Sequence, residues 1–241
     1  FDFKALLLLR RFVIQNKITH IHAHSSSVFF GALLKLLRPK LRLIWHDHYG
    51  NSEMLNERPV FVLQLASCFV SRIISVNQKL QSWAITKLFC KRVAFLPNFT
   101  SVSSDDLETT FLKGSDGKRI VCLANLRPQK NHQMLLQIAK ALQSTHPDWT
   151  FHLVGKDFKD SYSGQLRATL FQMKLESHVF IDGTQQEISG ILKQCSIGVL
   201  TSDSEGLPVS ILEYGLAGLA VIATHVGVVG QVLTEQYVIL V

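Results

Sequence analysis

The chain has 241 residues, and 47% of them are hydrophobic. That share is ample for a packed core and too high for a disordered chain. No apolar run approaches the ~18 residues that a membrane-spanning helix needs. The four cysteines form no CxxC pair, so we expect them to be reduced, buried residues of a cytoplasmic protein; they are Cys68, Cys90, Cys122 and Cys195.

The net charge of +7 is spread unevenly. Residues 1–100 carry 14 lysines and arginines against 4 acidic residues, whereas residues 101–241 carry 11 against 14. A basic first half favours peripheral contact with an anionic membrane surface, or a phosphate-bearing acceptor, although a generic solvated basic face is the alternative. We expect no nucleic-acid partner, because no basic motif interleaved with aromatic residues is present.

Apolar, β-rich runs alternate with helical patterns almost throughout the chain. This alternation predicts parallel sheets built from strand–helix–strand units. In chain order, the first half is predicted to contain a helix over 3–17, a strand over 18–23, a helix over 28–37, a strand over 41–45, a loop over 46–57, a helix over 59–70, a strand over 72–76, a helix over 78–89 and a strand over 92–96.

Serine, threonine, aspartate and glycine dominate residues 98–118, which predicts an interdomain linker over 101–118 between domains at 1–100 and 119–241. The second domain is predicted to contain strands over 120–124, 150–154, 179–181, 197–200 and 220–223, helices over 132–143, 165–175, 186–194, 208–217 and 228–233, and a final strand. The chain begins without methionine and ends in an apolar run, so we expect a piece of a longer protein.

Two carboxylates, Glu205 and Glu213, stand eight residues apart and bracket a Gly-Leu-Pro turn and the start of an apolar helix. An apolar strand precedes them, so the first carboxylate is predicted to lie at a helix N-terminus, at the carboxyl end of a sheet, where open α/β sheets bind ligands. A sugar nucleotide suits this geometry, with hydroxyls on the carboxylates and pyrophosphate on the helix N-terminus. Two solvated glutamates on an amphipathic helix are the alternative.

Arg127 and Lys130 follow the predicted strand over 120–124 and precede a helix. Fixed cations beside free backbone N–H groups make a diphosphate site, and they would stabilise a leaving nucleoside diphosphate without a metal. Exposed basic side chains at a helix start are the alternative.

His20, His22 and His24 alternate along one predicted strand, so all three are predicted to face one side. With His46 and His48 they suggest a metal site. The preferred interpretation is polar residues at strand ends beside a cleft, and no metal is expected.

The spacing of Glu205 and Glu213 resembles the Glu-x7-Glu signature of retaining GT-B glycosyltransferases, family 4 in particular. Leu126 and Lys130 match the family's leucine and lysine after the first strand of the second domain. Asn125 stands where the family often has arginine, and Arg127 is the nearby candidate to supply that charge. The resemblance implies an α/β fold of GT-B type, with two Rossmann-like parallel-sheet domains facing a cleft.

By this resemblance, Glu213 holds the ribose hydroxyls of the donor and Glu205 contacts the transferred sugar. His46 matches the family histidine that reaches toward that sugar. The other residues that the resemblance implies are the donor-binding Arg127, Gly155, Gly183, Thr184, Gly206 and Leu207, and the acceptor-side His24 and His48.

The resemblance also implies the function, which is retaining transfer of a sugar from a UDP- or GDP-sugar to a glycan or lipid-linked acceptor hydroxyl. Glu205, His46 and Lys130 are the expected catalytic residues, with no metal or other cofactor. Surface polysaccharide or lipid-linked glycan synthesis is the expected setting. The alternatives are an epimerase or phosphorylase on the same fold, or a non-catalytic protein that binds nucleotide sugars.

Overall fold

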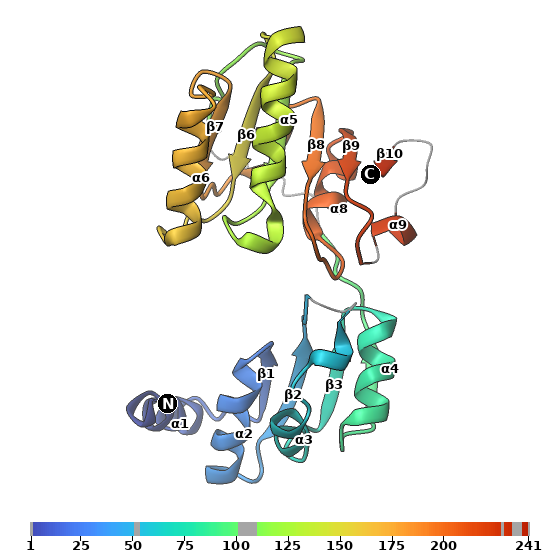
Figure 1. The fold of residues 1–241 in the computed structure, drawn as a ribbon. Coiled ribbons are helices and arrows are strands. Elements are labelled where there is room, and N and C mark those ends of the chain that lie inside the picture. The colour runs from blue at the N-terminus through green and yellow to red at the C-terminus, as the bar shows by residue number, and fades with distance from the viewer. Residues whose placement is uncertain (1, 51–53, 101–109, 228, 233–237, 241) are drawn as a thin grey trace. The chain divides into compact units, whose positions relative to one another are not determined.

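The structure, a computed structural model, describes residues 2–50, 54–100, 110–227, 229–232 and 238–240. The chain divides into two compact units, Phe1–Asn98 (unit 1) and Phe99–Val241 (unit 2). In each unit a parallel sheet is built from strands that alternate along the chain with helices (Figure 1). None of the described helices is both long enough and apolar enough to cross a bilayer.

Unit 1 contains a four-stranded sheet in the order β1-β2-β3-β4, the same order as in the sequence. Its core joins Leu43 and Trp45 of β2 and Ile73 of β3 to apolar residues of the helices. The elements of unit 1 are α1 (Phe3–Gln15), β1 (His20–His24), α2 (Ser27–Leu37), β2 (Arg42–Asp47), a 3-10 turn η1 (Leu55–Glu57), α3 (Phe61–Ser67), β3 (Arg72–Ser75), α4 (Gln78–Lys87) and β4 (Val93–Phe95).

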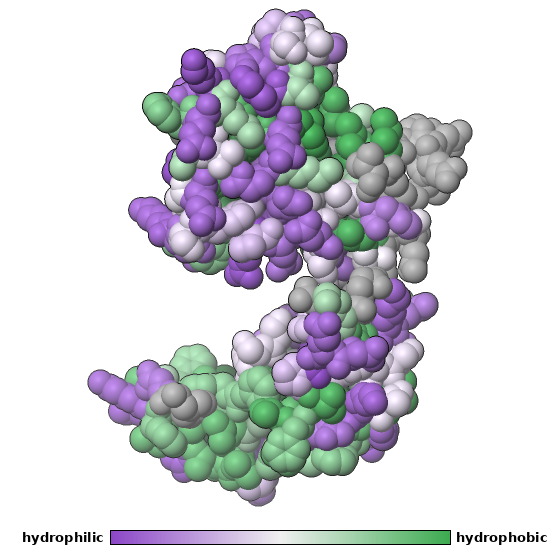
Figure 2. Space-filling view, viewed as in Figure 1, coloured by the Kyte–Doolittle hydropathy of each residue, from purple (hydrophilic) through white to green (hydrophobic). Residues whose placement is uncertain are grey.

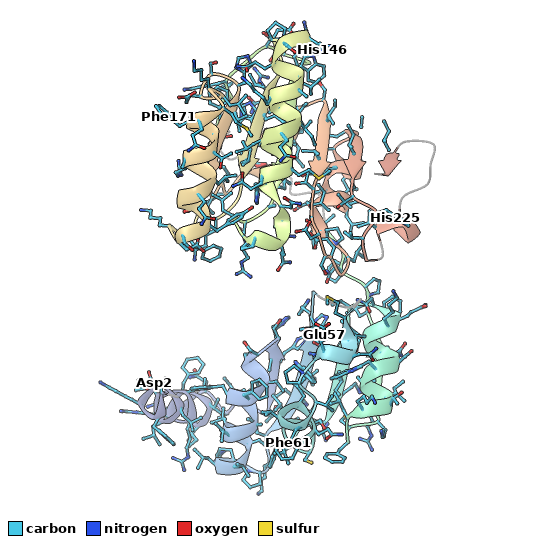
Figure 3. The ribbon with its side chains drawn as sticks, in the orientation of Figure 1. Asp2, Glu57, Phe61, His146, Phe171 and His225 are labelled. Atoms are coloured by element: carbon cyan, nitrogen blue, oxygen red, sulfur yellow. The ribbon has the colours of Figure 1, made fainter. Side chains whose placement is uncertain are left out.

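The first helix is fixed at its start and along one face. Asp2 caps α1, because its Oδ1 accepts a hydrogen bond of 3.0 Å from the backbone N–H of Ala5 (Figure 3). Leu6 and Val13 of α1 pack against Leu34 of α2 in a small second core. Most other apolar side chains of α1 are exposed.

Unit 2 contains a six-stranded sheet in the order β10-β9-β8-β5-β6-β7. The chain runs outward from β5 to β7 and then returns to β8 on the other side of β5, so the strand order reverses between β5 and β8. The elements of unit 2 are β5 (Arg119–Leu123), a 3-10 turn η2 (Pro128–Lys130), α5 (His132–Thr145), β6 (Thr150–Val154), α6 (Ser161–Gln172), β7 (Val179–Gly183), α7 (Ile188–Leu192), β8 (Ile197–Leu200), α8 (Val209–Leu216), β9 (Ala220–Ala223), α9 (Val229–Val232) and β10 (Val238–Leu240).

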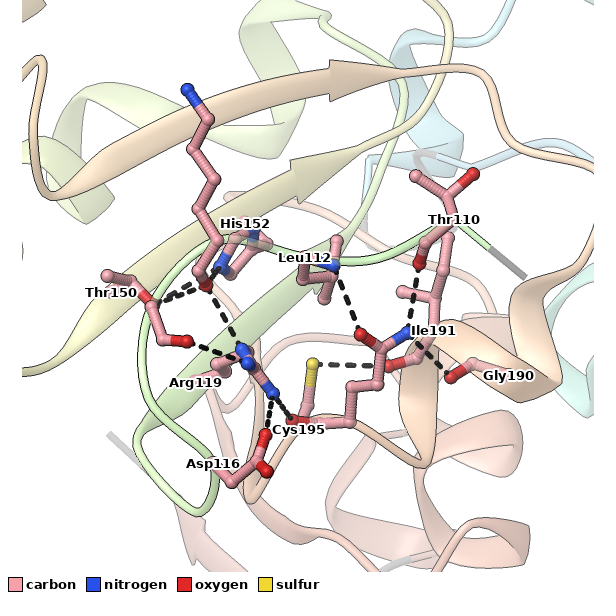
Figure 4. A network of polar contacts seen from close by, with 12 residues as sticks. Thr110, Leu112, Asp116, Arg119, Thr150, His152, Gly190, Ile191 and Cys195 are labelled. Carbon is pink, nitrogen blue, oxygen red and sulfur yellow. Dashed lines mark hydrogen bonds and ion pairs between the residues drawn. The ribbon is translucent and has the colours of Figure 1, made fainter.

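The segment that enters unit 2 is held against its sheet by a polar network (Figure 4). Arg119 donates hydrogen bonds to the carbonyl groups of Lys113 at 3.0 Å and Gly114 at 2.7 Å. The Gln194 side chain accepts from the backbone N–H of Leu112 at 3.0 Å, and Leu112 is buried in the core. Part of the predicted linker, 101–109, lies outside the described residues. Residues 110–118 belong to unit 2, where these bonds hold them.

Several predicted boundaries were wrong. The helix predicted over 165–175 begins at Ser161, because Asp160 caps it by accepting from the Ser163 N–H at 3.0 Å. The helix predicted over 59–70 spans only Phe61–Ser67, and β2 extends two residues into the predicted loop. Cys68, predicted to be buried, is exposed.

A buried ion pair that the sequence analysis did not identify joins β2 to the loop before α3. Arg58 donates to both carboxylate oxygens of Asp47, at 2.7 and 2.8 Å, and the two side chains are 6% and 1% exposed. The guanidinium carbon also lies 4.5 Å from the Trp83 ring centre and 4.3 Å from that of Tyr49. The pair therefore links the carboxyl end of β2 to α4.

We predict that Arg58→Ala lowers the free energy of unfolding of unit 1 by about 3–5 kcal/mol, because it leaves a buried carboxylate unpaired. Denaturant titration measures this change. The matched control is Arg167→Ala in unit 2, which removes a pair between the exposed Arg167 and the partly exposed Asp157 and is expected to cost less than about 1 kcal/mol. Equal effects of the two substitutions would contradict the prediction.

Candidate functional site

A cavity of about 400 Å³ lies in unit 2 where β5, β6 and β7 end and α8 begins. This is the edge beside the reversal of strand order, the position at which open α/β sheets bind ligands. The volume is within the range of small-molecule sites. The cavity is lined by Leu123, Ala124, Asn125, Lys130, Val154, Gly155, Lys156, Thr184, Gln185, Ile188, Pro208, Val209, Ser210 and Glu213.

Hydrogen bonds join the loop after β5 to the loop after β8. The Thr201 hydroxyl donates to the carbonyl of Lys130 at 3.0 Å. The backbone N–H of Asp203 donates to the carbonyl of Gln129 at 2.9 Å, and its carboxylate accepts from the Asn131 side chain at 2.8 Å. These bonds fix the two loops on either side of the strand reversal against each other.

Lys130 and Glu205 form an ion pair between these loops. The Ser202 hydroxyl donates to the same carboxylate oxygen, Oε1, at 2.6 Å. The lysine side chain is 18% exposed and the glutamate 7%, so the alternative of exposed basic side chains does not describe Lys130. Lys130 lines the cavity, whereas Glu205 lies behind it, bonded to Lys130.

Glu213 projects from α8 into the cavity lining. Burial raises the pKa of its carboxyl group. The neighbouring Tyr214 holds α8 to the sheet, because its buried hydroxyl accepts from the N–H of Leu123 at 2.7 Å. Glu213 is therefore a partly desolvated carboxylate on a fixed helix, suited to accept hydrogen bonds from hydroxyl groups.

Of the two cations singled out in the sequence, Lys130 lines the cavity and Arg127 does not, whereas Lys156 was not singled out and lines it. Lys156 lines the cavity, and its backbone N–H donates to the Asn125 side chain at 2.8 Å. Arg127 is exposed, and its guanidinium carbon lies 4.8 Å from the Phe158 ring centre. The sequence analysis missed Lys156, although its place directly after the strand-end glycine was an available signal. The role of Arg127 in binding diphosphate stays a prediction.

Glycines allow the backbone segments around the cavity to approach one another. A Cβ at Gly155 would lie 2.2 Å from the carbonyl oxygen of Ala124, so only glycine lets the ends of β5 and β6 meet. Gly183 ends β7 with a φ of +70°, and its neighbour Thr184 lines the cavity. Gly206 and Leu207 lie just before α8, outside the lining, and Leu207 is buried.

Four of the five histidines singled out in unit 1 lie together at the carboxyl ends of β1 and β2, whereas His20, at the start of β1, bonds to Thr19. His24 and His46 are register partners, and the His46 and His48 ring centres are 4.0 Å apart. Burial and the neighbouring histidines lower the pKa of His46 to about 4, and the same causes lower the pKa of His22. The lowered pKa favours the neutral form of His46 and of His22 at pH 7. The contact of His46 with a donor sugar stays a prediction.

A second cavity, of about 540 Å³, lies within unit 1 beside this cluster. His48 and the Asp47–Arg58 pair line it together with apolar side chains such as Phe29 and Val62. Polar groups on an otherwise apolar wall suit a ligand with both characters, in keeping with the acceptor-side prediction for His48.

The sequence model of the family described as "Glycosyl transferases group 1" matches residues 117–241, more than half of the chain. The chain is 26% identical over 246 residues to a subunit of the human phosphatidylinositol N-acetylglucosaminyltransferase, covering 99% of this chain and 50% of that protein. It is 24% identical to the Escherichia coli UDP-Gal:alpha-D-GlcNAc-diphosphoundecaprenol alpha-1,3-galactosyltransferase, covering 93% of this chain and 62% of the relative. The chain thus spans half to two thirds of the length of these two curated relatives.

Solved structures share the fold. HepE of Anabaena, in complex with UDP and glucose, superposes with a TM-score of 0.74 at 20% identity, covering 96% of this chain and 67% of its own. Sucrose-phosphate synthase of Thermosynechococcus elongatus gives a TM-score of 0.75 at 16% identity, covering 99% and 64%. These likenesses confirm the predicted GT-B type of fold. With the family match, they show that the chain belongs to the group 1 glycosyltransferases.

Proposed function

We propose that the protein transfers a sugar from a nucleoside diphosphate sugar, a UDP-sugar by preference, to a lipid-linked or glycan acceptor hydroxyl with retention at the anomeric carbon. The observation that carries the proposal is the cavity at the strand reversal, which two lysines and a partly buried carboxylate line. The structure of the similar HepE with UDP and glucose supports a UDP-sugar donor. The names of the human and E. coli relatives support a lipid-linked acceptor.

In this proposal each end of the cavity binds one part of the donor. Glu213 accepts hydrogen bonds from the two ribose hydroxyls, since it is the carboxylate in the lining. Lys130, Lys156 and the N-terminal N–H groups of α8, around Ser210, bind the diphosphate. Lys130 then stabilises the negative charge that develops on the leaving diphosphate.

The transfer needs no side chain as a dedicated base. The acceptor oxygen forms its bond to the anomeric carbon on the face from which the bond to the diphosphate oxygen breaks. The acceptor proton passes to that leaving oxygen, so atoms and charge balance and the configuration is retained. The protein supplies position and charge stabilisation, and we expect donor activation to require no metal.

Glu205 and His46 are proposed to contact the sugar itself. Lys130 and Ser202 both donate to Oε1 of the Glu205 carboxylate, and its Oε2 is proposed to accept from a sugar hydroxyl. Glu205 also positions Lys130 through their ion pair. The neutral His46 ring suits a hydrogen bond to a sugar hydroxyl without a cost of deprotonation.

We also propose that unit 1 contacts an anionic membrane surface. Apolar side chains gather on its surface (Figure 2), and α1 carries Lys4, Arg10 and Arg11 among its apolar residues. Phe3 and Phe12 are 72% and 55% exposed, and Lys4 and Arg11 are exposed beside them. This combination is typical of helices that lie in a membrane interface.

The function is tested by calorimetric titration of UDP, GDP and their sugars into the full-length protein, with and without EDTA. We expect one nucleoside diphosphate to bind in both conditions. Glu213→Ala is expected to weaken that binding by about 1–3 kcal/mol, because it removes the acceptor for the ribose hydroxyls. Glu176→Ala, an exposed carboxylate of the same unit, is the matched control and should bind normally.

Unchanged affinity in Glu213→Ala would remove the ribose role. If none of the nucleotides tested binds, the assignment of the fold is unaffected, but the proposed function is refuted in favour of a phosphorylase or a non-catalytic scaffold.

Lys130→Ala is predicted to lower turnover by about 10²-fold or more, because the leaving diphosphate loses its cation. Initial rates of sugar transfer measure this, and thermal unfolding shows whether the variant is folded without the Glu205 pair. Lys140→Ala, an exposed lysine on α5, should transfer at the wild-type rate. A Lys130→Ala protein with a normal rate would refute the electrostatic role.

Phe12→Ser is predicted to weaken binding to vesicles of phosphatidylcholine and phosphatidylserine by about ten-fold, because the membrane-bound protein would no longer bury this phenylalanine in the bilayer. Co-sedimentation measures the partition. Phe171→Ser on α6 of unit 2 removes a phenylalanine that is 71% exposed (Figure 3) and is the matched control. Equal partition of both variants with wild type would contradict the membrane role of α1.

A further inference from the structure

Four histidine side chains of unit 1 lie in ring contact at the carboxyl ends of two neighbouring strands. His22 and His24 point to the same side of β1, and His46 lies beside them on β2. The ring centres of His22 and His24 are 4.5 Å apart, those of His22 and His46 5.3 Å, and those of His24 and His46 5.1 Å. His48 follows β2 and stacks on His24 at 5.1 Å.

Three of these rings can direct a nitrogen to one point. One ligand nitrogen from each of His22, His24 and His46 lies within 4.8 Å of the other two. Tetrahedral Zn²⁺ with Zn–N distances near 2.0–2.1 Å requires neighbouring ligand atoms about 3.4 Å apart. The His22 and His46 rings lie parallel, at 5°, so coordination by all three histidines would require side-chain rotation, and it would leave a fourth position for water or another ligand.

Hydrogen bonding in the cluster favours coordination. Both ring nitrogens of His46 are buried and lack a hydrogen-bond partner in the described structure. A buried polar atom without a partner is destabilising, and a metal bond would satisfy one of the two His46 nitrogens. His24 Nδ1 and His48 Nε2 share a hydrogen bond at 2.9 Å, the kind of outer contact that orients a ligating imidazole.

The donor set selects the class of metal. Asp47, the carboxylate between His46 and His48 in the sequence, is bound by Arg58 through both oxygens and does not join the cluster. Three imidazoles without carboxylate suit Zn²⁺, Co²⁺, Ni²⁺ or Cu²⁺, whereas Mg²⁺ and Ca²⁺ require oxygen ligands.

We infer that His22, His24 and His46 form a binding site for a divalent transition metal ion, Zn²⁺ in the first place, with His48 orienting His24. The site is separate from donor activation. One consequence rests on the proposed function: a bound ion occupies His46, so that this ring no longer contacts the donor sugar, and Zn²⁺ inhibits transfer.

The test uses the full-length protein without a polyhistidine tag. Co²⁺ titration followed by visible absorption is expected to show the bands of a four-coordinate site at one equivalent, and Zn²⁺ is expected to displace the ion. His22→Ala should weaken binding at least about ten-fold. His20→Ala is the matched control, because His20 is an exposed histidine of the same strand, bonded to Thr19 instead of to the cluster.

Absence of Co²⁺ binding, or equal loss in His22→Ala and His20→Ala, would overturn the site. Mg²⁺ should neither bind nor compete, and competition by Mg²⁺ would overturn the class of metal. Because His22 is exposed, its replacement is expected to leave the thermal unfolding of unit 1 unchanged.

A rate measurement separates this inference from the proposed function. Zn²⁺ at saturating concentration is expected to inhibit wild-type transfer, while His22→Ala keeps its own metal-free rate at that concentration. Metal binding without inhibition would support the site and remove the contact of His46 with the donor. Nucleotide binding to unit 2 is expected to be unchanged by Zn²⁺, so a failed nucleotide titration and a failed metal titration are told apart.

Discussion

The candidate site depends on one constraint, the pairing of β5 with both β6 and β8 in a parallel sheet. Parallel strands bring their carboxyl ends to one edge of the sheet. After β5 the chain continues toward β6, and after β8 it continues toward β9, on the opposite side. The loops after β5 and β8 therefore diverge unless hydrogen bonds join them. Here they are bonded. Thr201 and Asp203 hold the loop after β5 through backbone and side-chain hydrogen bonds. These bonds fix the backbone of Lys130, and the ion pair with Glu205 holds its ammonium group.

The same strands determine the orientation of the helix that carries Glu213. A Cβ at Gly198 of β8 would lie 2.4 Å from the Tyr214 ring, so this glycine makes room for the ring against the sheet. The Tyr214 hydroxyl donates toward the carbonyl of Val199 at 3.2 Å while it accepts from Leu123. Tyr214, which has no role in the chemistry, therefore fixes α8 against the sheet, and this determines where the adjacent Glu213 side chain points.

Local patterns were enough to predict most strands. They were also enough to predict that Lys130 and Glu213 lie at the carboxyl edge of the sheet, because both residues come after the end of a strand, at or within the helix that follows. Contacts that join distant segments were not predictable in this way. The Asp47–Arg58 pair depends on how the loop after β2 folds back, which no local spacing encodes. By contrast, the sequence analysis did group His22 and His24 with His46 and His48, and the pairing of β1 with β2 brings these four together. The late start predicted for α6 has a different cause. Gly164 lowers the helix propensity of the first turns of α6, so the sequence pattern favoured a helix that begins after Gly164 over one capped by Asp160.

Charge balance at the cavity explains why a single lysine is insufficient. Lys130 is already paired with Glu205, so the charge that a diphosphate meets there is partly neutralised. A second cation and backbone N–H groups must supply the rest, and Lys156 and the start of α8 lie on the same lining. The partly buried Glu213 adds negative charge on this lining, which disfavours a diphosphate near it and favours neutral hydroxyls. In the proposed function, this distribution of charge would orient the nucleotide, with its ribose toward Glu213 and its phosphates toward the lysines.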